Sequence, residues 1–147
     1  MELLVQPIVD NAMDRSQAEA LAQRWAHEGV AKGQVEVFDE LVSADAIDHS
    51  GPTDVQGIEG FKVRTRAVHA ALQSIEIVVE ELLVDGDKIA WRWTLKGTHH
   101  GPFLGVPPTG KRVSMTGMNI QRVSHGLVVE HWSNADQLGL LRQVQSP

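Results

Sequence analysis

The sequence contains no cysteine, which excludes disulfide bonds, thiol nucleophiles and thiolate metal sites. No run of apolar residues approaches the roughly 18 that a transmembrane helix needs, and the first residues lack the basic segment of an export signal. The 13 basic residues are outnumbered by 19 acidic ones and do not cluster. A net charge of −6 disfavours phosphate backbones and anionic lipids. We therefore expect a cytoplasmic protein whose partners are neither nucleic acids nor membranes.

The common signatures of nucleotide, metal and serine chemistry are also missing. Gly101, Gly105 and Gly110 lie between two expected strands, and no Lys-Ser/Thr on a helix follows them. His99 and His100 are adjacent, so on a strand they point to opposite faces and do not chelate one ion. No HExxH motif and no Gly-x-Ser-x-Gly motif occurs. The sequence therefore predicts neither a metal site nor a bound cofactor.

A length of 147 residues fits one domain, and no repeat or linker divides it. We expect a single domain over residues 1–147, with residues 1–14 as an N-terminal tail. A capping box formed by Ser16 and Glu19 begins the first helix. Apolar residues at helical spacing then predict three helices, at residues 17–31, 34–42 and 55–72.

The second half of the chain has the alternation and turn residues of β-strands. Its proline- and glycine-rich segment, residues 101–110, is typical of a loop. Asp85-Gly86-Asp87 indicates a tight hairpin turn. The expected strands are residues 75–84, 88–98, 112–123 and 127–135, followed by a closing helix over residues 136–143. Helices that precede consecutive antiparallel strands indicate an α+β fold.

Asp136, at the end of the last expected strand, is the most informative carboxylate. Residues 124–126 read as a three-residue link, which sets a hairpin register in which paired residue numbers sum to about 250. In this register the face of Asp136 also carries Trp132, Met118, Asn134 and Thr116. Apolar surroundings raise the pKa of a carboxylate toward that of a useful general base. The alternative is that Asp136 only caps the closing helix.

Several motifs resemble one family. Residues 97–111 (GTHHGPFLGVPPTGK) look like the signature loop of the SnoaL-like polyketide cyclases, also called ester cyclases. Downstream, residues 126–132 (GLVVEHW) followed by Asp136 agree with the same family, as do residues 57–62 (GIEGFK) upstream. The similarity covers approximately residues 16–143.

The resemblance implies an NTF2-like fold, in which a curved antiparallel sheet wraps around the N-terminal helices to form a cone with a deep pocket. It also implies that the aspartate at position 136 removes an acidic proton beside an ester carbonyl. The resulting carbanion closes a ring by intramolecular aldol addition, without a metal or organic cofactor. Gln121 stands where many members have an aromatic residue, and we expect it on the face opposite the pocket.

Further site residues are expected around Asp136. The resemblance places His49 at the pocket mouth, although a surface histidine in a loop is the alternative. Asn134 is expected to stabilise the enolate oxygen, unless it is an ordinary amide at the strand end. Trp25 and Trp132 line the pocket or simply pack in the core. Besides these residues, the predicted substrate-binding set includes Met118, Thr116 and His99, the last of which is better explained as an anchor of the loop at residues 107–111.

The leading interpretation is therefore a cofactor-free enzyme that uses a general base on a small apolar or polyketide-like substrate. A non-catalytic NTF2-like protein that binds a small ligand is the alternative from another class, and an isomerase or hydrolase on the same fold is a third. We also expect a homo-oligomer, a dimer or tetramer. Leu127, Val129 and His131 predict an apolar outer side of the sheet, and such patches often mark interfaces.

Overall fold

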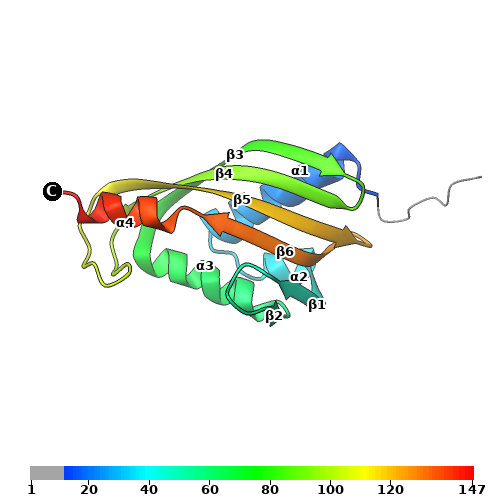
Figure 1. Ribbon diagram of the computed structural model, residues 1–147, viewed down its shortest axis with the longest axis horizontal. Helices are drawn as coiled ribbons and strands as arrows, with labels where there is room; N and C mark the ends of the chain where they lie inside the picture. Colours follow the sequence, from blue (N-terminus) through cyan, green and yellow to red (C-terminus); the bar gives the residue numbers. More distant parts are fainter. Residues whose placement is uncertain (1–11) are drawn as a thin grey trace, which may run out of the picture.

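A curved sheet of six strands, covered on one face by helices, makes up the protein (Figure 1). The computed structural model describes residues 12–147, so most of the predicted tail at residues 1–14 lies outside the described residues. The elements, in chain order, are α1 (Arg15–Gln23), the π-helix η1 (Arg24–Ala31), α2 (Val37–Leu41), β1 (Val42–Asp48), β2 (Val55–Gln56), α3 (Glu59–Ala71), β3 (Leu72–Asp85), β4 (Lys88–His99), β5 (Arg112–Ser124), β6 (Leu127–Ala135) and α4 (Gln137–Gln145).

The strand order is β2-β1-β6-β5-β4-β3. The four long strands, β3 to β6, form an antiparallel meander, and the sheet is open rather than closed into a barrel. The expected α+β class and the expected curved sheet are thus confirmed. The short strands β1 and β2 extend the sheet beyond the four predicted strands, and β1 pairs with β6 in parallel.

The first helix begins two residues earlier than the sequence pattern indicated. Asp14 is the N-cap: its carboxylate accepts from the Gln17 amide at 2.7 Å, and the Gln17 side chain accepts from the Asp14 amide at 3.3 Å. The capping box predicted at Ser16 and Glu19 is therefore wrong. Asp14, the residue before the helix, takes the role of N-cap because its carboxylate accepts from a backbone amide of the first turn that has no partner within the helix. The helix then continues as η1 to Ala31.

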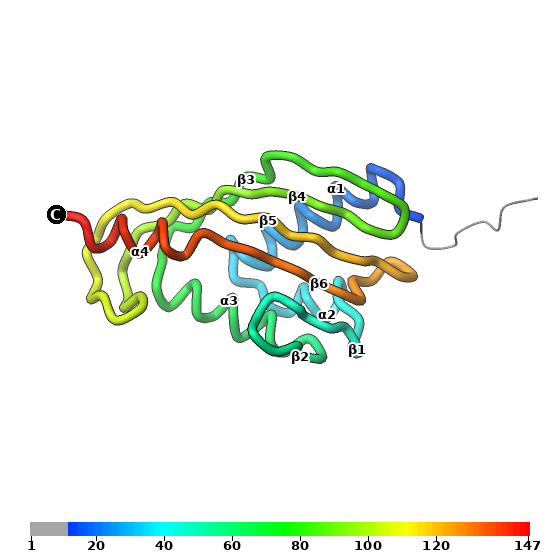
Figure 2. Tube along the Cα trace, in the orientation of Figure 1, coloured from blue at the N-terminus to red at the C-terminus, as the bar shows by residue number. Residues whose placement is uncertain are grey.

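The helices α1, η1, α2 and α3 lie against the concave face of the sheet, and α4 extends from the end of β6 (Figures 1 and 2). Their apolar stripes supply much of the core, including Leu21, Trp25, Phe38 and Phe61. The helix predicted over residues 55–72 starts only at Glu59, since Val55–Gln56 instead form β2 against β1.

The last hairpin differs in register from the prediction. Its turn consists of His125 and Gly126, whose φ angles are 51° and 79°, a two-residue turn of the kind that joins tight hairpins. A bulge after Arg122 shifts the pairing once more, so that Arg122 lies opposite Glu130 and Ile120 opposite Trp132. The predicted sum of 250 is therefore wrong by two, although the same residues still share a face.

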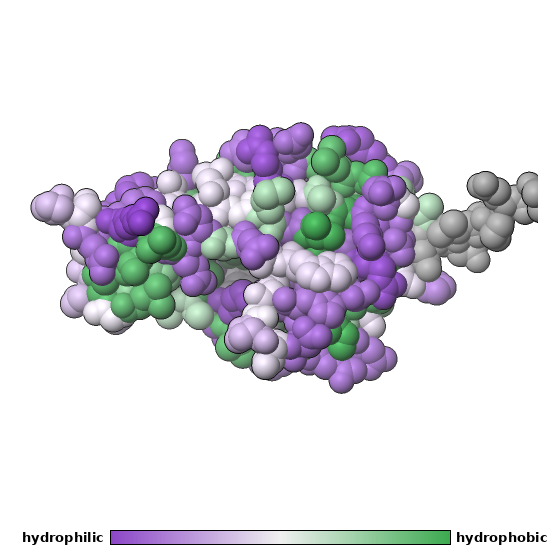
Figure 3. Space-filling view, viewed as in Figure 1, coloured by the Kyte–Doolittle hydropathy of each residue, from purple (hydrophilic) through white to green (hydrophobic). Residues whose placement is uncertain are grey.

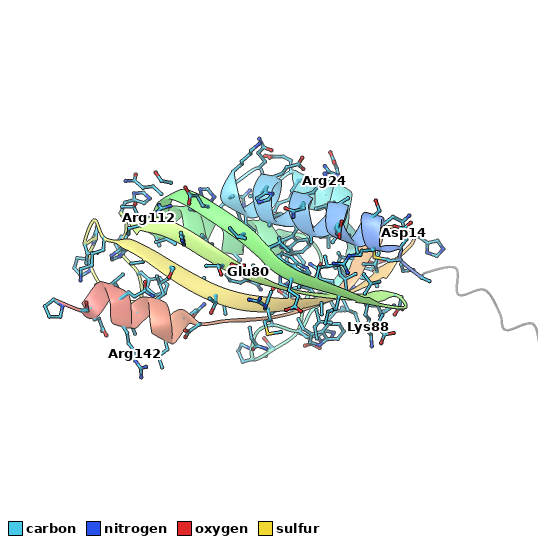
Figure 4. The ribbon with its side chains drawn as sticks, turned by 90° about the horizontal axis from the view of Figure 1, so that it is seen from above. Asp14, Arg24, Glu80, Lys88, Arg112 and Arg142 are labelled. Carbon is cyan, nitrogen blue, oxygen red and sulfur yellow. The ribbon has the colours of Figure 1, made fainter. Side chains whose placement is uncertain are left out.

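The two ends of the sheet are far apart along its long axis (Figure 4). At one end, Asp14 lies near Lys88 and the β3–β4 turn, where the Met13 amide donates to the Gly86 carbonyl at 3.0 Å. At the other end lie Arg112 and Arg142, beside the loop at residues 101–110 and α4. No helix in residues 12–147 is long and apolar enough to cross a membrane.

Candidate functional site

A cavity of about 150 Å³ lies between the concave face of the sheet and the helices. The surface is hollowed between β6 and α3, in the place where both elements contribute lining residues (Figure 3). Aromatic rings form much of the wall, and they are Trp25, Phe38, Phe61, Trp91 and Trp93. A site of this kind binds a largely apolar small molecule and orients it with few polar groups.

The alternation of strand residues decides which polar groups reach the cavity. Trp91, Trp93 and Leu95 of β4 point inward, while Arg92 and Lys96 between and beyond them are exposed. Residues paired across neighbouring strands lie on the same face of the sheet, so the odd-numbered residues in the paired parts of β5 and β6 point inward as well. The polar residues that line the cavity are Arg64, Thr65, Asn119, His131, Ser133 and Gln137.

Two indole–amide pairs connect β4 to β5 beneath the cavity. The Trp91 Nε1–H donates to Gln121 Oε1 at 3.1 Å, and the Trp93 Nε1–H donates to Asn119 Oδ1 at 3.2 Å. Gly117 makes room for the second pair, since a Cβ there would lie 2.1 Å from the Trp93 ring. The two amides are therefore held in defined orientations.

His131 is the buried titratable group of the cavity wall, with 2% of its surface exposed. Its ring stacks on Trp25 at a centroid distance of 5.1 Å and meets the edge of Phe61 at 5.2 Å. Burial lowers the pKa of His131 to about 4; Asp48 opposes this effect, and Arg64 adds to it. His131 is therefore a neutral imidazole near pH 7.

Asp48 is the buried carboxylate beside His131, its partner across the β1–β6 pair. The Ser50 hydroxyl donates to Asp48 Oδ1 at 2.6 Å, and the Arg64 guanidinium donates to Oδ2. Burial by itself would raise the pKa of Asp48, but the bonds from Ser50 and Arg64 outweigh it and the pKa is lowered. Asp48 thus remains ionised and holds Arg64 at the cavity rim.

The sequence of this chain matches the family model described as SnoaL-like polyketide cyclase over residues 20–144. The chain belongs to the SnoaL-like polyketide cyclase family. Nogalonic acid methyl ester cyclase from Streptomyces nogalater is 28% identical over 123 residues, which are 78% of this chain and 88% of that protein. Aklanonic acid methyl ester cyclase DnrD from Streptomyces peucetius is 28% identical over 74% of each chain.

Solved structures agree with this membership. TsrD from Streptomyces laurentii superposes with a TM-score of 0.82 at 28% identity, over 92% of this chain and 99% of that one. IdmH from Streptomyces antibioticus has a TM-score of 0.78 at 30% identity, over 88% and 99% of the two chains. The resemblance stated from the sequence is confirmed by these matches.

Within this family member, Asp136 does not lie where the sequence pattern predicted. Asp136 is exposed, and its Oδ1 accepts from the Gly139 amide at 2.8 Å as the N-cap of α4. It lies between Ala135 and Gln137, which line the cavity, but does not itself line it. The expected sequestration of Asp136 is therefore wrong, because β6 ends at Ala135 and Asp136 caps the following helix in an exposed position.

The residues predicted to surround Asp136 share the outer face of the sheet. Asn134 and Thr116 are exposed, Met118 is 59% exposed and Trp132 is half-buried. The structure brings them together, as the parity of the hairpin required, but outside the cavity. The prediction that they line a pocket is wrong, since alternation defines two faces without saying which one the helices cover.

His49 also belongs to the outer face rather than to the cavity mouth. Its ring stacks on Trp132 at 4.9 Å, and its Nε2 and Nδ1 donate to Glu130 at 2.8 Å and Asp54 at 2.9 Å. The hydrogen bonds to Glu130 and then Asp54 raise the pKa of His49. Glu130 in turn accepts from Arg122 at 2.6 Å, so this cluster is a surface ion-pair network.

Trp25 and His99 are the two predicted residues on the inner side of the fold. Trp25 lines the cavity and packs against Phe38, with ring centroids 4.9 Å apart. His99 is fully buried away from the cavity lining, and its Nδ1 bonds to the Thr109 hydroxyl at 2.9 Å and accepts from the Thr109 amide. Its contacts are therefore those of a loop anchor.

The sequence analysis missed the polar strand residues that do reach the cavity, chiefly His131 and Asn119, and the buried Gln121 that bonds to His131. Gln121 was expected to face away from the pocket, yet it is fully buried on the inner face. The signal was the alternation of Trp91 and Trp93 with charged residues in β4. Because twelve residues connect β4 to β5, the sequence alone does not give the pairing register of the two strands. The inward-facing residues of β5 therefore could not be inferred from those of β4. No group of three or more His, Asp or Glu side chains suited to a metal occurs in residues 12–147.

Proposed function

We propose that this protein is a cyclase that closes a carbocyclic ring in a polyketide ester by an intramolecular aldol addition. The single observation that carries the proposal is the aromatic cavity of a SnoaL-like chain with a neutral histidine and an oriented amide on its wall. Two of its relatives are named as methyl ester cyclases, which makes a polyketide methyl ester the substrate class to test.

The chemistry makes a limited demand on the protein. A proton leaves the carbon beside the ester carbonyl, and that carbon forms a bond to a ketone carbon of the same molecule. The ketone oxygen then takes up a proton, so substrate and product are isomers and no redox cofactor takes part. Negative charge develops on oxygen in both steps, and preorganised hydrogen-bond donors in a water-poor site stabilise it. The donors on the cavity wall suit this demand.

The proposal is tested by incubating the purified protein with aklanonic acid methyl ester or nogalonic acid methyl ester, without added metal or cofactor. We expect a product of unchanged mass and altered retention on liquid chromatography with mass detection. Ser133 lines the cavity, so Ser133→Phe should fill it and abolish product formation.

Thr116→Phe is the matched control, because it places the same ring on the outer face of the neighbouring strand, where Thr116 is exposed. Its activity should equal that of the wild-type protein. If both esters bind but remain unchanged, the ligand-binding alternative gains support. If Ser133→Phe is as active as Thr116→Phe, the cavity is not the site.

We also propose that the protein forms a homodimer through the outer face of the sheet. Leu83, Ala90, Ile120 and Trp132 form a row across four strands. Leu83 is 61% exposed and Ile120 44%, and Figure 3 shows apolar side chains at the centre of this face among hydrophilic ones. Exposed apolar surface of this kind favours association with a second copy. The face predicted from Leu127, Val129 and His131 was wrong, since His131 is buried inside.

A further inference from the structure

A chain of three hydrogen-bonding side chains runs from β4 across β5 to β6 under the cavity. The Trp91 indole N–H donates to Gln121 Oε1 at 3.1 Å, and Gln121 Nε2 lies 3.1 Å from His131 Nδ1. Gln121 is 0% exposed and His131 2% exposed. Water therefore competes little with these hydrogen bonds. Each of the two bonds also has a defined donor and acceptor.

The donor and acceptor of each bond follow from the indole of Trp91. An indole nitrogen only donates a hydrogen bond, so Gln121 must present its carbonyl oxygen to Trp91. Its amide N–H₂ then faces His131 and donates to Nδ1. A neutral imidazole that accepts at Nδ1 carries its proton at Nε2. The position of the His131 proton is thus determined by Trp91, two strands away.

The Nε2–H of His131 is left for the cavity. The ring lines the cavity wall, and the side-chain hydrogen bond found for it among the described residues is made by Nδ1 and not by Nε2. Besides Gln121, the groups that face the ring are Asp48 on β1, Arg64 on α3 and the aromatic rings of Trp25 on η1 and Phe61 on α3. None of them accepts a hydrogen bond from Nε2, so this donor is available to a ligand.

Asn119 supplies a second hydrogen-bond donor, because a tryptophan indole also fixes the orientation of its amide. The Trp93 indole donates to Asn119 Oδ1 at 3.2 Å, which turns the N–H₂ group of the amide away from Trp93. Asn119 lies opposite Ser133 and Gln121 opposite His131, so Asn119 and His131 are diagonal neighbours on one face of the sheet. Such neighbours have Cα atoms about 7–8 Å apart, a separation at which both side chains can reach one ligand oxygen.

We propose that the His131 Nε2–H and the Asn119 amide together bind the oxygen that becomes negatively charged in the substrate, and that Gln121 and Trp91 are positioning residues that keep His131 in the neutral, Nε2-protonated form. The assignment rests on the proposed function and deepens it, because it specifies a substrate that presents a carbonyl able to become an enolate. A neutral imidazole can polarise a carbonyl as a hydrogen-bond donor.

Two features of the site keep the imidazole neutral. Adding a proton at Nδ1 would set an N–H against the N–H₂ group of Gln121, which has no lone pair to accept it. Burial among Trp25 and Phe61 disfavours the charged ring as well. The first feature depends on the amide of Gln121, and a carboxylate of the same shape would reverse it.

Gln121→Glu is therefore the decisive variant. One carboxylate oxygen would still accept from Trp91, but the other would need a donor from His131 and would draw the proton to Nδ1. NMR nitrogen shifts of the His131 ring in the unliganded protein report which nitrogen is protonated. We expect Nε2–H in the wild type at about pH 7, and Nδ1–H or a doubly protonated ring in Gln121→Glu. Gln73→Glu, at an exposed position, adds the same charge as a control and should leave the ring unchanged.

Trp91→Phe covers the case in which Gln121→Glu does not fold. It removes the donor that orients Gln121, so a mixture of the two His131 tautomers is expected. The cyclisation rate of Gln121→Glu should fall about 10²–10³-fold, as for loss of one oxyanion donor, while KM changes little. Wild-type His131 protonated at Nδ1 or charged at about pH 7, or a Gln121→Glu enzyme of full activity with a switched tautomer, would overturn the proposal.

A ligand titration separates this proposal from the proposed function. Pentane-2,4-dione, a small enolate-forming ketone, should shift the Nε2 resonance of His131 in the wild type and much less in Gln121→Glu. That result would stand even if neither polyketide ester is turned over. Absence of any shift at saturating ligand would exclude the donor role, whatever the enzyme assay shows.

Discussion

At the residue scale, His131 in β6 and Asp136 just after β6 have side chains in very different surroundings. His131 points into the core, where stacking on Trp25 and loss of water keep it neutral. Asp136 lies five residues later, just after the end of the strand, where its Oδ1 accepts from the amide of Gly139. An inward histidine and an outward capping aspartate are therefore expected to respond differently to substitution.

Asp136→Asn decides between the base that the family resemblance implies and the helix cap that the structure shows. Asparagine caps a helix about as well as aspartate, so both stability and cyclisation activity should be nearly unchanged. Turnover of the polyketide ester and denaturant unfolding of the same preparation measure the two quantities. A loss of about 10²-fold or more in rate at unchanged stability would restore Asp136 as the general base.

The buried His131 should also make the folded state sensitive to acid. Its pKa lies at about 4 in the folded protein, against an ordinary value of 6.5. As pH falls through this window the unfolded chain binds a proton that the folded chain does not, so the stability contribution is lost downward from about 6.5. The loss amounts to about 3 kcal/mol at most.

Urea unfolding at several pH values across this window measures the effect. His131→Gln should flatten the decline relative to the wild type, while His100→Gln, at an exposed position, should not. Parallel declines for wild type and His131→Gln would contradict the buried neutral imidazole.

At the element scale, the contact between β4 and β5 is the support of the site. The Trp93 ring lies over Gly117, the residue opposite it in the register, and its indole then reaches Asn119. Strand pairing sets the backbone positions of these residues. Because Gly117 has no side chain, the Trp93 ring can lie over it and its indole N–H can reach the amide of Asn119. A methyl group at this position should therefore disturb both packing and the amide.

Gly117→Ala is expected to destabilise the fold by about 1–3 kcal/mol, as overpacking does, because its Cβ would lie 2.1 Å from the Trp93 ring. Gly60→Ala is the matched control: its Cβ would meet only Val55 Cγ1 at 3.4 Å, and alanine within α3 should stabilise by up to about 1 kcal/mol. Thermal unfolding of the two variants compares them. Equal melting temperatures for Gly117→Ala and the wild type would show that the ring moves aside freely.

At the scale of the whole molecule, the curved sheet separates two surfaces with different tasks. The concave side and its helices enclose the cavity, while the outer side carries the apolar row of Leu83, Ala90, Ile120 and Trp132. Ion pairs accompany this row on both sides, Glu81 with Arg92 and Arg122 with Glu130. Paired charges of both signs allow a second copy to approach around a two-fold axis without net repulsion.

The dimer predicts that static light scattering at micromolar concentration gives twice the mass of the chain. Ile120→Glu should convert the protein to a monomer, because it places a charge in the centre of the apolar row. Val63→Glu, on the exposed side of α3 with 55% of its surface free, should leave the mass unchanged. A monomeric wild-type protein would remove the outer face as an interface.

Local pattern determined much of this protein from its sequence. The strand over residues 127–135 was predicted with both ends correct, because alternation and turn residues are local signals. The β3–β4 hairpin and the loop at residues 101–110 were also predicted in the right places, although β3 begins at Leu72 rather than at residue 75. Hairpin parity was also correct for Met118, Trp132 and Asn134, which do share a face.

Only the tertiary structure decided which face is inside. A strand with polar residues on both sides, such as β6, looks alike from either face until helices cover one of them. Cover by η1 and α3 buried His131 and left Asp136 in solvent. The parallel pairing of β1 with β6, which sets Asp48 beside His131, is equally invisible locally, because residues 49–126 separate the two strands in the chain. Contacts between distant segments, rather than local preferences, thus selected the residues of the candidate site.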